Sequence, residues 1–234
     1  MCVLIASVVS GLGGCAKPQP STSNVLPPLP GSSPVRTTPE TQRLQARAAY
    51  ERGLTHWRDR QIGAALSALR EAVALDRAVP LYHNTLGLVL LELQRPELAL
   101  EEFRAATTLD PSYGDAHLNL GVALAESTRW EEAVAAYRRA LALPTLTSPS
   151  TAHQNLGLAL YHLRRFAEAE EALRFALSLE PRMEAAYYNL GLVFVAQGRH
   201  EDAKSVFRRA RDLAPSSPFG QAAAQRLRGL GDGG

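Results

Sequence analysis

The chain has 234 residues, enough for one or two domains, and its 46% hydrophobic and 21% charged content is typical of soluble helical proteins. Its formal net charge of +2 gives no general attraction to nucleic acid, and no basic face with interleaved aromatic residues is apparent. Both cysteines, Cys2 and Cys15, lie in the first fifteen residues, so the rest of the chain has no disulfide or thiol chemistry.

The N-terminal stretch resembles the signal peptide of a bacterial lipoprotein. The apolar run at residues 3–9 is too short for a membrane-spanning helix, which takes about 20 residues, but suits the h-region of a signal peptide. Small residues then lead to Cys15, as in a lipobox, although residues 1–6 contain no Lys or Arg. The resemblance implies that residues 1–14 are a signal peptide and that Cys15 is lipidated. The alternative is an ordinary apolar N-terminus with a chance cysteine.

A proline-rich segment follows, and we assign residues 15–40 to a lipidated, disordered tether. Such a segment cannot bury a core and favours extended chain, which at about 3.1 Å per residue reaches on the order of 75 Å. The alternative is a disordered tail that serves only solubility. The prolines lie at positions 18, 20, 27, 28, 30, 34 and 39.

A Leu-Gly pair then recurs through apolar runs with helical spacing, and a weaker copy has Arg52 before its glycine. The glycines follow one another at intervals of 34, 34, 36 and 34 residues. A fixed period of this size predicts stacked supersecondary units, because one unit alone cannot bury its apolar face. The glycines are Gly53, Gly87, Gly121, Gly157 and Gly191.

Each glycine is followed, at constant intervals along the sequence, by a small residue, a large apolar residue and an alanine. A proline ends three of the units. We expect two antiparallel helices to approach closely at the glycine, with the large residue between them. The small residues are Ala65, Ala99, Ala133, Ala169 and Ala203; the large ones are Leu69, Phe103, Tyr137, Leu173 and Phe207.

This pattern resembles the tetratricopeptide repeat (TPR). The resemblance implies an all-α TPR solenoid, a right-handed superhelix of about eleven helices over residues 41–229. We place the repeats at about 46–79, 80–113, 114–147, 150–183 and 184–216, a capping helix at 217–229 and a disordered tail at 230–234. The extra residues of the 36-residue interval fall at Pro144 and Pro149, where both helices should break.

No pattern of residues indicates catalysis or a metal site. His83, His117 and His153 share one register, but equivalent positions on successive units are too far apart to hold one ion. No phosphate loop, nucleophile elbow or dinucleotide fingerprint occurs. We interpret the paired glutamates on the second helices, such as Glu131 and Glu132, as part of a solvent-exposed face. We therefore expect no enzymatic activity, no cofactor and no small-molecule substrate.

One stripe of each first helix is expected to line the concave groove of the array. Asparagine recurs in this stripe and can pair with the backbone of an extended peptide, while apolar and aromatic neighbours bury its side chains. The alternative is that these asparagines only join adjacent first helices. The predicted groove residues are Asn119, Asn155, Asn189, Leu88, Val122, Leu158, Leu192, Tyr161, Tyr188 and Trp57.

The lipobox, tether and TPR array together resemble the lipoproteins of type IV pilus biogenesis, the pilotins that help a secretin assemble. The lengthened junction before Asn155 is the most specific element of this resemblance. It implies a non-enzymatic scaffold, lipid-anchored in the bacterial cell envelope and facing the periplasm, with Ala16 suiting an outer-membrane location. Five repeats stand where six are usual. The alternatives are a general envelope adaptor for cell-wall enzymes or proteases, and an enzyme without a recognisable site.

Overall fold

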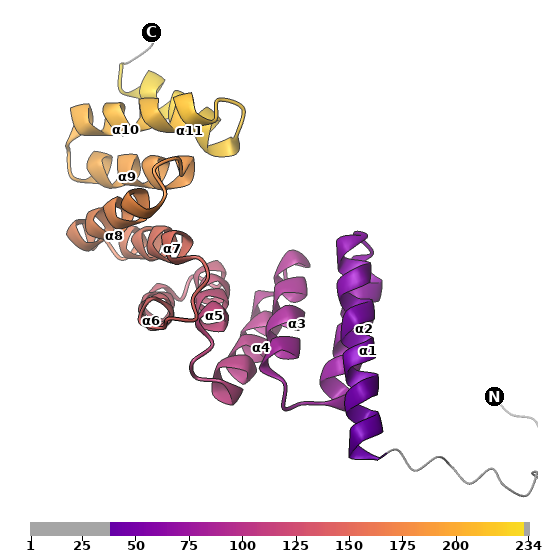
Figure 1. Cartoon of the computed structure of the whole chain (residues 1–234). Helices are drawn as coiled ribbons and strands as arrows, with labels where there is room; N and C mark the ends of the chain where they lie inside the picture. Colours follow the sequence, from indigo (N-terminus) through magenta and orange to yellow (C-terminus); the bar gives the residue numbers. More distant parts are fainter. Residues whose placement is uncertain (1–37, 232–234) are drawn as a thin grey trace, which may run out of the picture. The chain divides into compact units, whose positions relative to one another are not determined.

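The computed structural model describes residues 38–231, and this part of the chain contains eleven α-helices and no β-strand (Figure 1). The all-helical solenoid with a capping helix is therefore confirmed. The predicted signal peptide, Cys15 and most of the predicted tether lie outside the described residues. The helices are α1 (Pro39–Arg58), α2 (Ile62–Leu75), α3 (Pro80–Glu92), α4 (Pro96–Leu109), α5 (Gly114–Glu126), α6 (Trp130–Leu141), α7 (Pro149–His162), α8 (Phe166–Leu179), α9 (Glu184–Ala196), α10 (His200–Leu213) and α11 (Pro218–Gly229).

The helices form five antiparallel pairs, α1/α2 to α9/α10, and α11 packs on the last pair. Within the helical unit, α5 and α7 lie on the inner side of the bend and α6 and α8 on its outer side (Figure 1). Each pair is joined by a short turn whose middle residue has a positive φ, which closes the first helix. The residues are Arg60, Gln94, Thr128, Arg164 and Gly198, with φ of 61°, 57°, 56°, 60° and 76°.

The repeated glycine marks a close approach of the two helices of each pair. A Cβ added to Gly121 would lie 2.4 Å from Cε1 of Tyr137, and one added to Gly191 would lie 2.4 Å from Cε1 of Phe207. The same holds at the other three glycines, each against the large residue of its own unit. The predicted role of the glycine and its partner is confirmed in all five pairs.

The two ends of the array differ from the sequence prediction in small ways. Helix α1 begins at Pro39, inside the segment assigned to the tether, because Thr38 caps it: its hydroxyl oxygen accepts from the Thr41 amide at 3.2 Å, and proline suits the first helical position. Leu230, assigned to the disordered tail, is half-buried after α11 and lines a pocket with that helix.

The lengthened junction at residues 142–148 packs back on the preceding turn. The Thr145 hydroxyl accepts from the Gly114 amide at 2.9 Å and donates to the Ser112 carbonyl. Both the amide and the hydroxyl of Thr147 donate to Oδ1 of Asp115, at 2.9 and 3.0 Å. The junction therefore bonds to the turn before α5 and to the first two residues of α5, and both helices break here as predicted.

One continuous core runs from α2 to α11 and holds the large residues of all five units. A smaller cluster around Tyr82 joins α1 and α2 to α3. Within residues 38–231, no helix has both the length and the apolar character needed to cross a bilayer.

Candidate functional site

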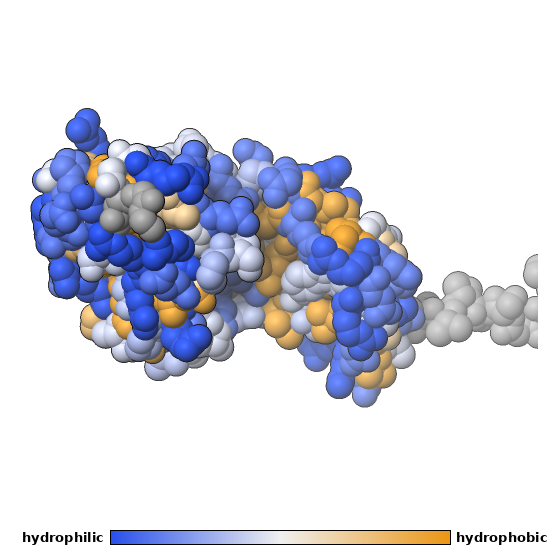
Figure 2. All heavy atoms as spheres, turned by 90° about the horizontal axis from the view of Figure 1, so that it is seen from above, coloured by the Kyte–Doolittle hydropathy of each residue, from blue (hydrophilic) through white to orange (hydrophobic). Residues whose placement is uncertain are grey.

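The predicted groove residues lie on the first helix of each pair and are mostly half-buried. Figure 2 shows apolar side chains gathered on the hollowed side of the helical unit. From N- to C-terminus, the stripe comprises Trp57 on α1, Leu88 on α3, Asn119 and Val122 on α5, Asn155, Leu158 and Tyr161 on α7, and Tyr188, Asn189 and Leu192 on α9. The structure thus places all ten on one series of helices.

The N-terminal half of this stripe is occupied by its own hydrogen bonds. The Asn119 amide donates to Oδ1 of Asn84 at 3.0 Å, and the Asn84 amide donates to the Tyr113 hydroxyl at 3.3 Å. The indole N–H of Trp57 donates to Oε2 of Glu92 at 2.6 Å. Asn119 therefore joins α5 to α3, as the alternative interpretation of the asparagines requires.

The C-terminal half differs, because its asparagines lack such partners. Among the described residues, no side-chain hydrogen bond involves Asn155. Asn189 is 4% exposed, and its Nδ2 is buried without a hydrogen-bond partner. A buried amide nitrogen without a partner costs free energy, because it has given up its hydrogen bonds to water.

A pocket of about 250 Å³ lies between α5 and α7 and brings three of the predicted residues together. Its walls are mostly apolar, and Asn155 and Glu126 are the polar exceptions. Burial raises the pKa of the Glu126 carboxyl above its ordinary value. The lining residues are Val122, Ala125, Glu126, Trp130, Tyr137, Asn155, Leu158 and Ala159.

Trp130 forms one wall of this pocket and is held by stacking. Its ring lies parallel to that of His162, with centroids 4.0 Å apart and an interplanar angle of 8°. Neither Trp130 nor Glu126 was predicted for the site. Glu126 occupies the last place of the groove stripe, so the register could have identified it, whereas Trp130 starts the second helix and belongs to no stripe position.

The three histidines of one register have three different environments. The His83 ring bonds Oε2 of Glu102 at 2.7 Å and the Arg77 carbonyl at 3.1 Å, and the first of these bonds chiefly raises its pKa. Burial lowers the pKa of His117 and His153 instead. No group of three or more potential metal ligands occurs among residues 38–231.

The paired glutamates on the second helices form ion pairs as well as a solvated surface. Glu132 lies 2.6 Å from Arg129, and Glu170 lies 2.7 Å from Arg199 of the next repeat. Because most of these side chains are exposed, each pair stabilises the fold by about 1 kcal/mol or less. The Glu170–Arg199 pair joins α8 to the turn before α10, whereas Glu132 and Arg129 are only three residues apart in the sequence. Glu171, another of the paired glutamates, lines a pocket with His153 and Glu168.

The comparisons decide the family. A family model described as the tetratricopeptide repeat matches residues 50–113, 84–145 and 155–218. The chain belongs to the tetratricopeptide repeat family. TPR arrays are protein-interaction modules, so the family agrees with a groove rather than a catalytic centre. No curated protein matches the chain significantly by sequence.

Three solved structures illustrate the likeness of this TPR array to others. PilW, described as a widely conserved type IV pilus biogenesis factor, is 21% identical with a TM-score of 0.73, over 80% of this chain and 87% of PilW. PilF of Pseudomonas aeruginosa is 22% identical with a TM-score of 0.64, over 82% and 95%. YrrB, described as a TPR protein with an unusual peptide-binding site, is 20% identical with a TM-score of 0.64, over 77% and 92%. At these identities the likeness shows the fold.

Proposed function

We propose that this TPR array is a scaffold whose concave groove binds an extended segment of a protein partner, chiefly between α5 and α9. The observation that carries the proposal is the pocket between α5 and α7, where the Asn155 side chain makes no hydrogen bond to any residue of 38–231. The amide of Asn189 lies unpaired one repeat further on. The N-terminal half contributes less, because Asn119 is already bonded to Asn84.

Each part of this site has a distinct task. Asn155 offers a donor and an acceptor, and so pairs with a peptide backbone whatever its sequence. The pocket of about 250 Å³ is smaller than the roughly 300–1,000 Å³ of drug-sized ligand sites and suits a single side chain. Its apolar walls, Val122, Leu158 and Trp130, favour an apolar side chain or an aliphatic stem.

The finer proposal is a role in the cell envelope, with the secretin of a type IV pilus as the partner. The likeness of the fold to PilW and PilF and the lipobox-like Cys15 support it. A lipid on Cys15 would anchor the protein, most simply in the outer membrane facing the periplasm. The competing partner class is cell-wall enzymes or proteases, held by a general envelope adaptor through the same groove.

The test is the binding of overlapping synthetic peptides that tile the secretin encoded by the same genome, followed by fluorescence anisotropy. Losing one hydrogen bond and leaving its partner buried costs about 1–3 kcal/mol, so Asn155→Ala should weaken the best peptide about five- to a hundredfold. Glu131→Ala, on the exposed face of α6, is the control and should leave affinity unchanged.

Thermal unfolding of both variants is the control and should show that each remains folded. If Asn155→Ala binds as tightly as the unaltered chain, the groove is not the binding site and the proposal is wrong. If no secretin peptide binds but peptides of envelope proteases or cell-wall enzymes do, and Asn155→Ala weakens them, the groove stands and the pilus role fails.

A further inference from the structure

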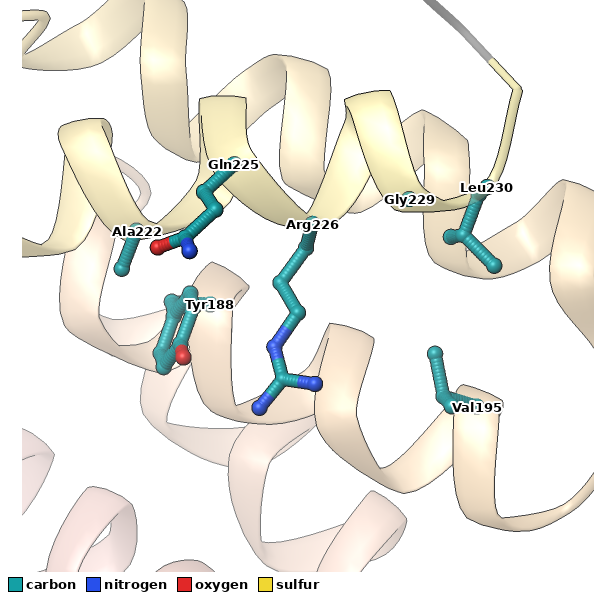
Figure 3. Close-up of a pocket in the computed structure, with 7 residues that line it drawn as sticks. All are labelled: Tyr188, Val195, Ala222, Gln225, Arg226, Gly229 and Leu230. Carbon is teal, nitrogen blue, oxygen red and sulfur yellow. The ribbon is translucent and has the colours of Figure 1, made fainter.

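A second pocket, of about 500 Å³, lies between the capping helix α11 and helix α9. Figure 3 shows Tyr188 and Val195 on α9, with Gln225 and Arg226 reaching towards them from α11. Leu230, just after α11, closes one end. Tyr188 is also a predicted groove residue, so this pocket continues the groove beyond the last repeat.

The pocket is positively charged. Arg226 is the one charged residue that lines the pocket, and no acidic residue lines it. Helix α11 contains Arg226 and Arg228 but no Asp or Glu, and Glu184, in the first turn, is the only acidic residue of α9. Across residues 38–231 the Arg226 side chain makes no hydrogen bond or ion pair; Asp232, the next acidic residue in the sequence, lies outside that range.

The surroundings of Arg226 define the chemistry of a ligand. A guanidinium presents parallel N–H donors that match the two oxygens of a carboxylate. The Gln225 amide supplies a further donor, while Tyr188, Val195 and Leu230 offer apolar surface. Nucleic acid would require a row of cations along its phosphates and stacking platforms, and this pocket has one arginine.

We propose that the pocket between α9 and α11 binds a carboxylate of the partner's segment, together with an adjoining apolar side chain. The carboxylate pairs with Arg226, and the apolar group lies against Tyr188, Val195 and Leu230. This inference rests on the proposed function, because it names the chemical group of a groove-bound segment that lies against α11. The carboxylate belongs either to an Asp or Glu side chain or to the partner's C-terminus.

The experiment uses ¹⁵N-labelled full-length chain and two pairs of short synthetic peptides. The first pair is acetyl-Ala-Leu-Phe as the free acid and as the amide; the second is acetyl-Leu-Glu-Leu-amide and its Gln counterpart. Binding is followed by the NMR chemical shifts of the Arg226 side-chain N–H and of the α11 backbone amides. Because Arg226 is exposed, each acidic peptide should bind about two- to fivefold more tightly than its neutral counterpart.

Arg226→Gln should abolish that preference, and Arg228→Gln, exposed on the same helix outside the pocket, should keep it. Preference for only the free acid identifies a C-terminal carboxylate, and preference for only the Glu peptide identifies a side chain. Equal binding of acidic and neutral peptides, equal effects of the two arginine variants, or tighter binding of oligothymidine at α11 would overturn the inference. The binding of secretin peptides to the Asn155→Ala variant tests the groove separately. If Asn155→Ala weakens that binding while Arg226→Gln has no effect on the short peptides, the proposed function stands and the site at α11 is rejected.

Discussion

Replacing Gly121 by alanine should destabilise the helical unit, although alanine is the better helix former. An added Cβ would lie 2.4 Å from Cε1 and 2.5 Å from Cδ1 of Tyr137. Ordinary contact begins at 3.4 Å, so the overlap is 3.4 − 2.4 = 1.0 Å. Tyr137 is 2% exposed and tightly packed in the core, although it also borders the pocket between α5 and α7. Relieving the overlap therefore requires either a shift of the ring towards that pocket or a separation of α5 and α6.

The magnitude follows from two opposing effects. Overpacking a tight core costs about 1–3 kcal/mol, and the buried ring places this site in the upper half of that range. Alanine recovers about 1 kcal/mol through helix propensity. The net loss in the free energy of unfolding is therefore about 1–2 kcal/mol.

The assay is urea unfolding followed by far-ultraviolet circular dichroism, with Gly63→Ala as the matched control. Gly63 is an exposed residue of α2, and a Cβ there would meet nothing within 4 Å. The control should be neutral or stabilising by up to about 1 kcal/mol. In a Tyr137→Ala background, Gly121→Ala should lose most of its cost. If Gly121→Ala is as stable as the unaltered chain, the close approach does not explain the glycine.

Three further predictions concern the turns, one ion pair and the N-terminal segment. Thr128 has a φ of 56°, which costs a residue with a Cβ roughly 1–2 kcal/mol. Thr128→Gly should therefore raise the free energy of unfolding by about 0.5–1 kcal/mol in the same titration, and a decrease would contradict the account. The hydrogen bond to Glu102 raises the pKa of His83 above the ordinary value of about 6.5. The pair therefore stabilises the fold fully below that ordinary value, and its contribution is lost as the pH rises through the raised pKa. Unfolding at two pH values should show Glu102→Gln losing about 1 kcal/mol more at about pH 5.5 than at about pH 9; equal losses would reject the pair. Cys15→Ser should release the protein from bacterial membranes and abolish labelling by a fatty-acid probe, and retention in the membrane fraction would refute lipidation.

The period predicts most of the fold because each repeat uses the same contacts. Gly121 and Tyr137 are separated by the same interval as Gly191 and Phe207, so the sequence pairs each glycine with its partner. The start of α1 was less predictable. Thr38 and Pro39 form a capped helix start, but they follow a proline-rich stretch that suggested continued extended chain.

The candidate site could be predicted only in part, because hydrogen-bond partners vary where positions repeat. Asn119 and Asn155 occupy the same position of successive repeats. The Asn119 amide bonds to Asn84 of the repeat before it. For Asn155, the repeat before it has Leu118 at the position equivalent to Asn84. A leucine cannot accept from an amide, so Asn155 stays without that partner. Arg226 lies beyond the last repeat, where no register assigns a side chain to a face.

The lengthened junction has a consequence for how the array loses structure. In a stacked array each repeat normally depends on its immediate neighbours, so a break can start at any seam and spread. Thr145 and Thr147, at the end of the third repeat, bond to residues at its beginning, so hydrogen bonds join the two ends of that repeat. It should be the last segment to exchange its amide hydrogens with solvent. The pocket between α5 and α7 borders this segment. Because the segment is already ordered before a partner binds, binding costs less conformational entropy of the protein.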